Sequence, residues 1–83
     1  MQIQLVYFAS VREAIGQPRE QWDTECADLD ALRLELQNRG EPWRTALGPD
    51  RPLRCAVNQS MVQGNVSLGS GDEVAFFPPV TGG

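Results

Sequence analysis

The sequence contains no histidine and no lysine. Imidazole serves most general acid–base schemes and many zinc sites, so its absence disfavours both kinds of chemistry. All seven basic residues are arginines, so the chain offers no lysine as an acceptor for isopeptide modification. The N-terminal amine is then the one amine nucleophile that the sequence provides.

Cysteine and long apolar runs are also scarce. Cys26 and Cys55 are too far apart to form a Cys-x-x-Cys pair. Met1 leads directly into strand-like sequence, so we expect no secretory leader. Both cysteines are therefore expected to be reduced thiols in a cytoplasmic protein. No apolar run approaches the ~20 residues that a membrane helix needs, so no membrane association is expected.

Size and charge restrict the function further. A chain of 83 residues forms one domain and buries only about 60–65% of its unfolded surface, which leaves little room for a deep pocket. We therefore expect function at an edge, a terminus or an interface. The net charge of −4 provides no basic face, which disfavours binding to nucleic acid or to a membrane surface.

Alternating apolar residues predict a first strand over residues 2–9, with Ile3, Leu5 and Tyr7 facing the core. The opposite face begins polar and becomes apolar at Val6 and Phe8. Turn residues and apolar spacing predict the remaining short elements. These are helical turns at 11–15, strands at 19–25, 53–58, 60–63 and 73–77, and a short helix at 43–47.

The main helix is predicted over residues 29–39. Asp28 is suited to cap its N-terminus, because its carboxylate can accept from free amides of the first turn. Leucines at 29, 32 and 36 form one apolar stripe. Arg39 is expected on the water-facing side of the helix end, and Gly40 to adopt the left-handed conformation that ends it.

This order of elements predicts an α+β protein of the β-grasp type, the architecture of ubiquitin. We expect a mixed sheet of four to five strands with one main helix packed on one face, and a right-handed crossover between parallel neighbours. The predicted domain covers residues 1–78, and residues 79–83 are predicted to form a flexible Gly-Gly tail.

The tail is the feature most directly linked to chemistry. Two prolines favour an extended exit from the body, and glycines without side chains can enter a narrow channel. The carboxylate of Gly83 can attack the α-phosphate of ATP, and a sulfur or nitrogen nucleophile can then capture the acyl-adenylate. The alternative is an uninformative frayed terminus. Two terminal glycines arise by chance in about one chain in 200, so they become significant only with the β-grasp order and the proline spacer.

A partner-binding surface is predicted beside the tail. Phe8 and Phe77 lie on the non-core side of the first and last strands, which are neighbours in a β-grasp sheet. With Met61 from the hairpin they would form an exposed apolar patch, the usual mark of a partner site. The alternative is that a loop of the same chain covers one or more of them.

Other residues are given structural roles. Trp22 and Trp43 are expected to pack at an edge or a helix instead of serving as stacking platforms. Cys55 is expected in the strand core as an inert thiol. Asp72 is interpreted as a turn-former, and Glu73 as a polar contact for a partner.

The C-terminal twelve residues are the strongest motif. Residues 72–83 read Asp-Glu-Val-Ala-Phe-Phe-Pro-Pro-Val-Thr-Gly-Gly, which resembles the C-terminal signature of the molybdopterin synthase small subunits (the MoaD family of ubiquitin-like sulfur carriers). Residues 56–59 resemble that family's hairpin, and residues 6–9 and 11–13 resemble its opening. The resemblance covers essentially the whole chain, while residues 63–70 fit less well and are expected to form a loop.

The resemblance implies a mechanism. An E1-like, MoeB-like enzyme would use ATP to adenylate Gly83, and sulfur would replace AMP to leave a thiocarboxylate. The tail would enter the MoaE-like large subunit of a heterotetramer and give its sulfur to cyclic pyranopterin monophosphate. The catalytic groups would belong to the large subunit, and this chain would bind no cofactor or metal itself. The implied partner contacts are Phe8, Met61, Phe77, Pro78, Pro79, Val80, Thr81 and Gly82.

Three other functions stay open at this stage. The thiamin-pathway carrier has the same fold and Gly-Gly chemistry, but typically a shorter chain without the Phe-Phe-Pro-Pro run. A ubiquitin-like modifier would place the Gly83 carboxyl group on lysines of target proteins. A purely structural role would leave activity unchanged when Gly82 and Gly83 are deleted.

Overall fold

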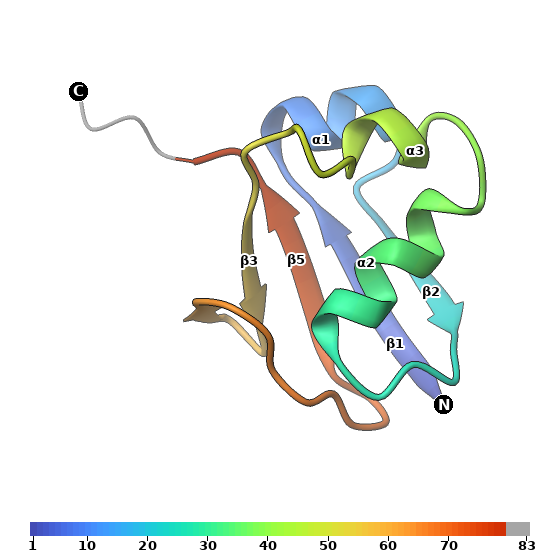
Figure 1. Cartoon of the computed structure of the whole chain (residues 1–83), viewed down its shortest axis with the longest axis vertical. Helices are drawn as coiled ribbons and strands as arrows, with labels where there is room; N and C mark the ends of the chain where they lie inside the picture. Colours follow the sequence, from blue (N-terminus) through green and yellow to red (C-terminus); the bar gives the residue numbers. More distant parts are fainter. Residues whose placement is uncertain (80–83) are drawn as a thin grey trace.

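The computed structural model describes residues 1–79, and every element predicted from the sequence is present (Figure 1). In chain order the elements are β1 (Gln2–Tyr7), α1 (Ala9–Ile15), β2 (Arg19–Asp23), α2 (Leu29–Gln37), α3 (Trp43–Ala46), β3 (Arg54–Val57), β4 (Ser60–Val62) and β5 (Glu73–Phe77). No helix in this part of the chain is long and apolar enough to cross a membrane.

The five strands form one sheet in the order β2-β1-β5-β3-β4. β1 and β5 are parallel neighbours, whereas the pairs β1–β2, β3–β5 and β3–β4 are antiparallel. Figure 1 shows β1 and β5 side by side, with α2 crossing the sheet and α1 and α3 near the end where both strands finish. The mixed sheet and its covering helix confirm the predicted β-grasp arrangement.

The core lies between the helices and one face of the sheet. Ile3, Leu5 and Tyr7 alternate along β1 and are almost completely buried, as the two-residue period predicts. The leucine stripe of α2 and the inward residues of β5 complete this layer. Its buried members are Ile3, Leu5, Tyr7, Val11, Leu29, Leu32, Leu36, Ala46, Leu47, Val74 and Phe76.

Polar side chains fix the ends of the elements. Asp28 caps α2 by accepting a hydrogen bond of 2.9 Å from the amide of Ala31, as predicted. Asp72 accepts a hydrogen bond of 2.7 Å from the amide of Gly69, which confirms its role in the turn before β5. Asn58 adopts a positive φ of 51° in the β3–β4 turn, and its side chain donates to Asp72. The hairpin and the start of β5 are therefore tied together.

Arg39 is not on the water-facing side, so that expectation is wrong. The helix ends at Gln37, and the following turn places the Arg39 guanidinium between the rings of Trp22 and Trp43, at 4.2 and 3.6 Å from their centroids. It also pairs with Glu20 at 3.1 Å. Both indoles therefore serve as stacking surfaces as well as packing against the core.

The segment over residues 63–70 is less free than the expected loop. The amide of Leu29 donates to the carbonyl of Val66, and the amide of Leu68 donates to the carbonyl of Ala27, both at 2.9 Å. Asp28 and Ser67 form an isolated antiparallel bridge between these contacts. The N-terminal end of α2 is thereby attached to the connection that leads into β5.

Candidate partner-binding site at the base of the tail

Parallel pairing of β1 with β5 brings the two predicted aromatic residues together. The amide of Phe8 donates to the carbonyl of Phe76 at 3.1 Å, which extends the pairing past the end of β1. The rings of Phe8 and Phe77 then meet edge to face, with centroids 6.3 Å apart and an interplanar angle of 83°. Phe8 has an exposed fraction of 50%.

Met61 lies on the same face of the sheet, but at the end of a neighbouring row. The strand registers align Val6 with Ala75, Ala75 with Ala56, and Ala56 with Met61. Val6, Ala56 and Ala75 are buried beneath their larger neighbours, while Met61 is 59% exposed. We call Val6, Phe8, Ala56, Met61, Ala75 and Phe77 the outer-face patch.

The small residues Ala56 and Ala75 were not identified as site residues from the sequence. The two-residue period that places Phe77 on the outer face also places Ala75 there, so the signal was present. Their short side chains keep the centre of the patch low between Met61 and the two phenylalanine rings. Apolar residues therefore occupy neighbouring positions of β1, β5, β3 and β4 on the face of the sheet opposite the core.

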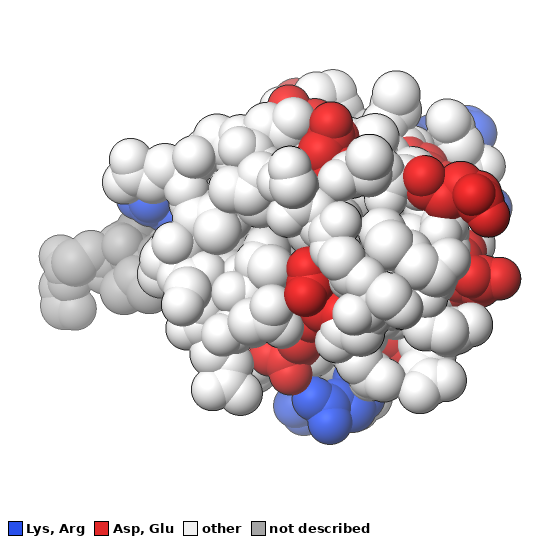
Figure 2. Space-filling model, turned by 90° about the horizontal axis from the view of Figure 1, so that it is seen from below, with Lys and Arg blue, Asp and Glu red and all other residues white. Residues whose placement is uncertain are grey.

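Charged residues border this surface. Arg19 begins the row that contains Val6, and its guanidinium lies 3.6 Å from the carboxylate of Glu73. Arg54 pairs with Phe77 in the sheet register and is exposed. On the end of the molecule that Figure 2 shows, acidic side chains are scattered and basic ones occupy a few separate places. This view contains no basic area of the kind that binds nucleic acid.

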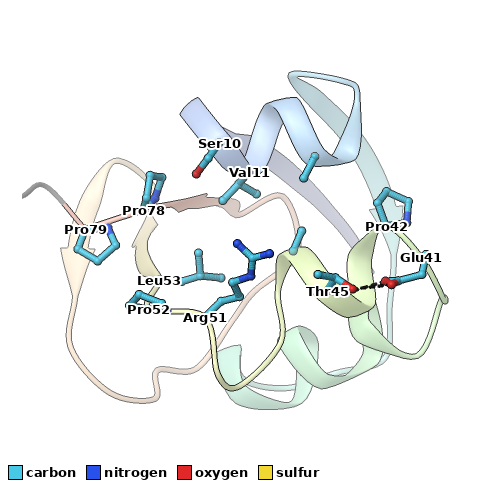
Figure 3. Close-up of a pocket in the computed structure, with 12 residues that line it drawn as sticks. Ser10, Val11, Glu41, Pro42, Thr45, Arg51, Pro52, Leu53, Pro78 and Pro79 are labelled. Carbon is cyan, nitrogen blue, oxygen red and sulfur yellow. Dashed lines mark hydrogen bonds between the residues drawn. The ribbon is translucent and has the colours of Figure 1, made fainter.

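Pro78 and Pro79 form the base of the tail and are half-buried between two hollows. The sheet-side pocket has a volume of about 390 Å³ and is bounded by Phe8, Ala9 and Phe77 together with both prolines. The helix-side pocket has a volume of about 440 Å³ (Figure 3). It is lined by Ser10, Val11, Ala14, Glu41, Pro42, Thr45, Ala46, Arg51, Pro52, Leu53, Pro78 and Pro79.

Two charged residues line the helix-side pocket. Glu41 is engaged by Thr45, whose amide and hydroxyl both donate to its carboxylate. The hydroxyl bond, followed by the amide bond, lowers the pKa of Glu41. Arg51 comes from the segment before β3, and its side chain points into the pocket (Figure 3).

Some of the predicted site residues lie within the described part of the chain and others lie beyond it. Phe8, Met61, Phe77, Pro78 and Pro79 are placed as above, whereas Val80, Thr81, Gly82 and Gly83 lie outside the described residues. The division into a domain over 1–78 and a tail over 79–83 therefore stays a prediction. So do the partner contacts assigned to eight of these residues and the chemical role assigned to Gly83.

The cysteines and carboxylates of residues 1–79 show no metal-binding arrangement. No cluster of three or more Cys, Asp or Glu side chains there could hold a metal ion. Burial raises the pKa of the Cys55 thiol, which makes it a weaker nucleophile. Cys26 and Cys55 are not bonded to each other.

Known proteins resemble this chain along nearly its full length. Residues 5–83 match the ThiS family. The molybdopterin synthase sulfur carrier subunit of Escherichia coli (strain K12) is 42% identical over 98% of this chain and 99% of its own. The protein of the same name from Mycobacterium tuberculosis (strain ATCC 25618 / H37Rv) is 35% identical over 100% of this chain and 99% of its own.

Solved structures show the same fold. One is a complex of subunits 1 and 2 of the molybdopterin-converting factor from Helicobacter pylori 26695, in which the matching chain has a TM-score of 0.71 and 27% identity over the full length of both chains. A putative molybdopterin converting factor subunit 1 from Pyrococcus furiosus has a TM-score of 0.77 and 26% identity over 96% of this chain and 99% of its own. The chain therefore belongs to the ThiS family, within which it resembles the molybdopterin synthase sulfur carrier subunits.

Proposed function

We propose that this chain is the sulfur carrier subunit of a molybdopterin synthase and that it carries sulfur on the carboxyl group of Gly83. The main support is the 42% identity to a protein of that name over 98% of the chain. The match to the ThiS family continues to residue 83, so it includes the Gly-Gly motif. The fold and the exposed apolar residues beside the tail base are consistent with a chain that partner proteins bind.

The proposed chemistry activates the terminal carboxylate of Gly83 and then replaces one of its oxygens by sulfur. A carboxylate oxygen of Gly83 attacks the α-phosphate of ATP, and pyrophosphate leaves. A sulfur nucleophile supplied by a sulfur donor then attacks the carbonyl carbon, and AMP leaves with the carboxyl oxygen. When the donor is a persulfide, this attack gives an acyl disulfide. A thiol then attacks the donor's sulfur, forms a disulfide with it and releases the thiocarboxylate of Gly83. An E1-like enzyme would supply the groups that catalyse both steps.

The outer-face patch supports binding to a large synthase subunit. It combines two aromatic residues and a methionine, which are enriched at the centres of protein interfaces. The complex from H. pylori joins subunits 1 and 2 of a molybdopterin-converting factor, which supports the same kind of partner here. Delivery of sulfur to cyclic pyranopterin monophosphate inside that partner, and a heterotetrameric assembly, are further parts of this proposal.

A division of labour follows from the described residues. Their two cysteines are part of the fold, and their perturbed carboxylates are engaged in structural hydrogen bonds, as Glu35 is with Trp22 and Thr24. The groups that protonate and deprotonate the pterin substrate would therefore come from the large subunit. This chain would contribute the activated sulfur and the surface that positions it.

Mass spectrometry tests the proposal directly. The purified chain is incubated with an activating enzyme, ATP and a sulfur donor, and exchange of one oxygen for sulfur at the acyl carbon adds about 16 Da. A fragment spectrum that places this mass on Gly83 supports the carrier function. Lysine conjugates of higher mass without any thiocarboxylate would indicate a protein modifier and would contradict it.

Transfer to a pterin distinguishes this function from a thiamin-pathway carrier. The charged chain is mixed with the large synthase subunit and cyclic pyranopterin monophosphate, and dithiolene formation is followed together with loss of the 16 Da increment. We expect two charged chains to lose their sulfur for each dithiolene that forms. Retention of the sulfur in this mixture, with transfer to a thiazole precursor instead, would assign the chain to the other pathway.

A further inference from the structure

The helix-side pocket shares no residue with the outer-face patch, although it borders the same tail base. Its walls are mostly apolar and come from α1, α3 and the segment before β3. Figure 3 shows the side chain of Arg51 directed into it. Within residues 1–79, no hydrogen bond or ion pair is made by the guanidinium of Arg51.

The segment that presents Arg51 is held firmly by α2. The guanidinium of Arg33 donates to the carbonyls of Leu47 at 2.8 Å and Gly48 at 2.7 Å, and to that of Arg51 at 3.3 Å. The backbone at Arg51 is therefore fixed in position by hydrogen bonds from Arg33. The acidic residue that lines the pocket, Glu41, already accepts hydrogen bonds from the amide and the hydroxyl of Thr45, so it is not the natural counter-ion of Arg51.

Insertion of the tail requires a partner to surround the tail base. Pro78 and Pro79 line both the sheet-side and the helix-side pockets, one on each side of the chain. A channel that receives the residues after Pro79 must have a mouth that encloses this base. The partner surface would then cover both pockets. The sheet-side pocket offers only apolar and aromatic side chains, whereas the helix-side pocket adds one cation.

We propose that the helix-side pocket receives a segment of the large synthase subunit bearing a carboxylate that pairs with Arg51. The planar guanidinium presents a fork of N–H donors that matches a carboxylate, and apolar walls around the pair would strengthen their attraction. A partner without an acid at this point would leave the arginine desolvated and unpaired, which is unfavourable. This inference rests on the proposed function, because it takes the large subunit as the partner.

Charge reversal tests the contact. Affinity for the large subunit is measured by titration calorimetry for the wild type, for Arg51→Glu and for Arg44→Glu. Arg44 is an exposed residue of α3 that does not line the pocket, so its replacement makes the same change in net charge. We expect Arg51→Glu to weaken binding by about 30-fold or more, as loss of a desolvated charge pair does. Arg44→Glu should change affinity by less than about threefold, as a charge at the rim does.

Cross-linking identifies the occupant. Because the sequence has no lysine, Arg51→Lys introduces the one lysine amine of the chain. A carbodiimide, which joins an amine to a carboxylate in direct contact, should link residue 51 to an Asp or Glu of the large subunit, and Arg44→Lys should give no such product. A link from residue 51 to the chain's own Gly83, with none to the large subunit, would overturn the proposal.

The binding measurements distinguish a failure of the proposed function from a failure of the assignment of the helix-side pocket. If the wild-type chain does not bind the large subunit at all, the proposed function fails. If the wild type binds and Arg51→Glu binds equally well while remaining folded by circular dichroism, only the assignment of the helix-side pocket fails. Equal weakening by both charge reversals would also overturn it, because a general effect of net charge would then explain the result.

Discussion

Replacement of Phe8 by alanine should weaken binding to the large subunit and also lower the stability of the fold, and the two losses can be measured separately. Half of the side chain is exposed in the free chain. An aromatic side chain buries 150–250 Å² in all, so about 100 Å² remains for a partner to cover. At about 25 cal/mol per Å² this area contributes about 2.5 kcal/mol, which corresponds to about a 60-fold increase in Kd.

The fold should also lose stability, because the buried half of the Phe8 side chain covers about 100 Å² and contributes about 2.5 kcal/mol at the same coefficient. Phe8 is the N-cap residue of α1 but makes no side-chain capping bond, so alanine removes no cap. The edge-to-face contact with Phe77 is lost, which lowers the free energy of unfolding by about 0.5–1.5 kcal/mol. Titration calorimetry gives the Kd, and urea unfolding gives the stability.

Leu34 provides a matched control on the other side of the molecule. It lies on α2 and is 59% exposed, the same fraction as Met61 in the outer-face patch. Leu34→Ala should leave the Kd within about twofold, because a lone exposed apolar residue outside an interface contributes little. Equal Kd values for the wild type and Phe8→Ala, or an equal loss for Leu34→Ala, would refute the assignment of the patch as the binding surface.

Three further substitutions test the patch and the fold. Phe77→Ala should also raise the Kd for the large subunit tenfold or more while the chain stays folded, since residues of this kind at an interface centre cost about 2 kcal/mol; unchanged affinity in the same titration would contradict the patch. Glu35→Ala removes hydrogen bonds of 2.7 Å from both Trp22 and Thr24, so urea unfolding at neutral pH should show a loss of about 2–3 kcal/mol. The hydrogen bond from Thr24 lowers the pKa of Glu35 in the folded chain. The stability difference between the wild type and Glu35→Ala should therefore be complete above pH 4.5, the ordinary pKa, and disappear as the pH falls through the lowered pKa of the folded state. A stability difference that does not change with pH would show that ionisation of Glu35 does not contribute. Arg39→Met should lower the unfolding free energy by about 2–3 kcal/mol, because it removes stacking on two indoles and leaves Glu20 without its cation, and stability equal to the wild type would exclude that contribution.

Local patterns were sufficient to predict most of the fold. The period of two in residues 2–9 correctly placed Ile3, Leu5 and Tyr7 in the core, and the leucine stripe with Asp28 located α2. These signals are reliable because each depends on residues close together in the chain. The two-residue period also placed Phe8 and Phe77 on the outer face, where the structure finds them in contact.

Features that depend on distant segments could not be read in the same way. Stacking of Arg39 requires Trp22 from β2 and Trp43 from α3, and no spacing in the sequence relates the three. The helix-side pocket could not be predicted from the sequence either, because it forms only where α1, α3 and the segment around Arg51 meet at the tail base. Residues 63–70 lack a regular apolar period, so their pairing with residues 27–29 left no local signal.

Removal of the two terminal glycines provides the most direct test of the central claim. A variant ending at Thr81 retains the outer-face patch and both pockets, so it should bind the large subunit through these surfaces. In a reconstituted assay with the activating enzyme, ATP, a sulfur donor and cyclic pyranopterin monophosphate, it should form no thiocarboxylate and deliver no sulfur. Sulfur transfer by this variant at the rate of the full chain would contradict the account.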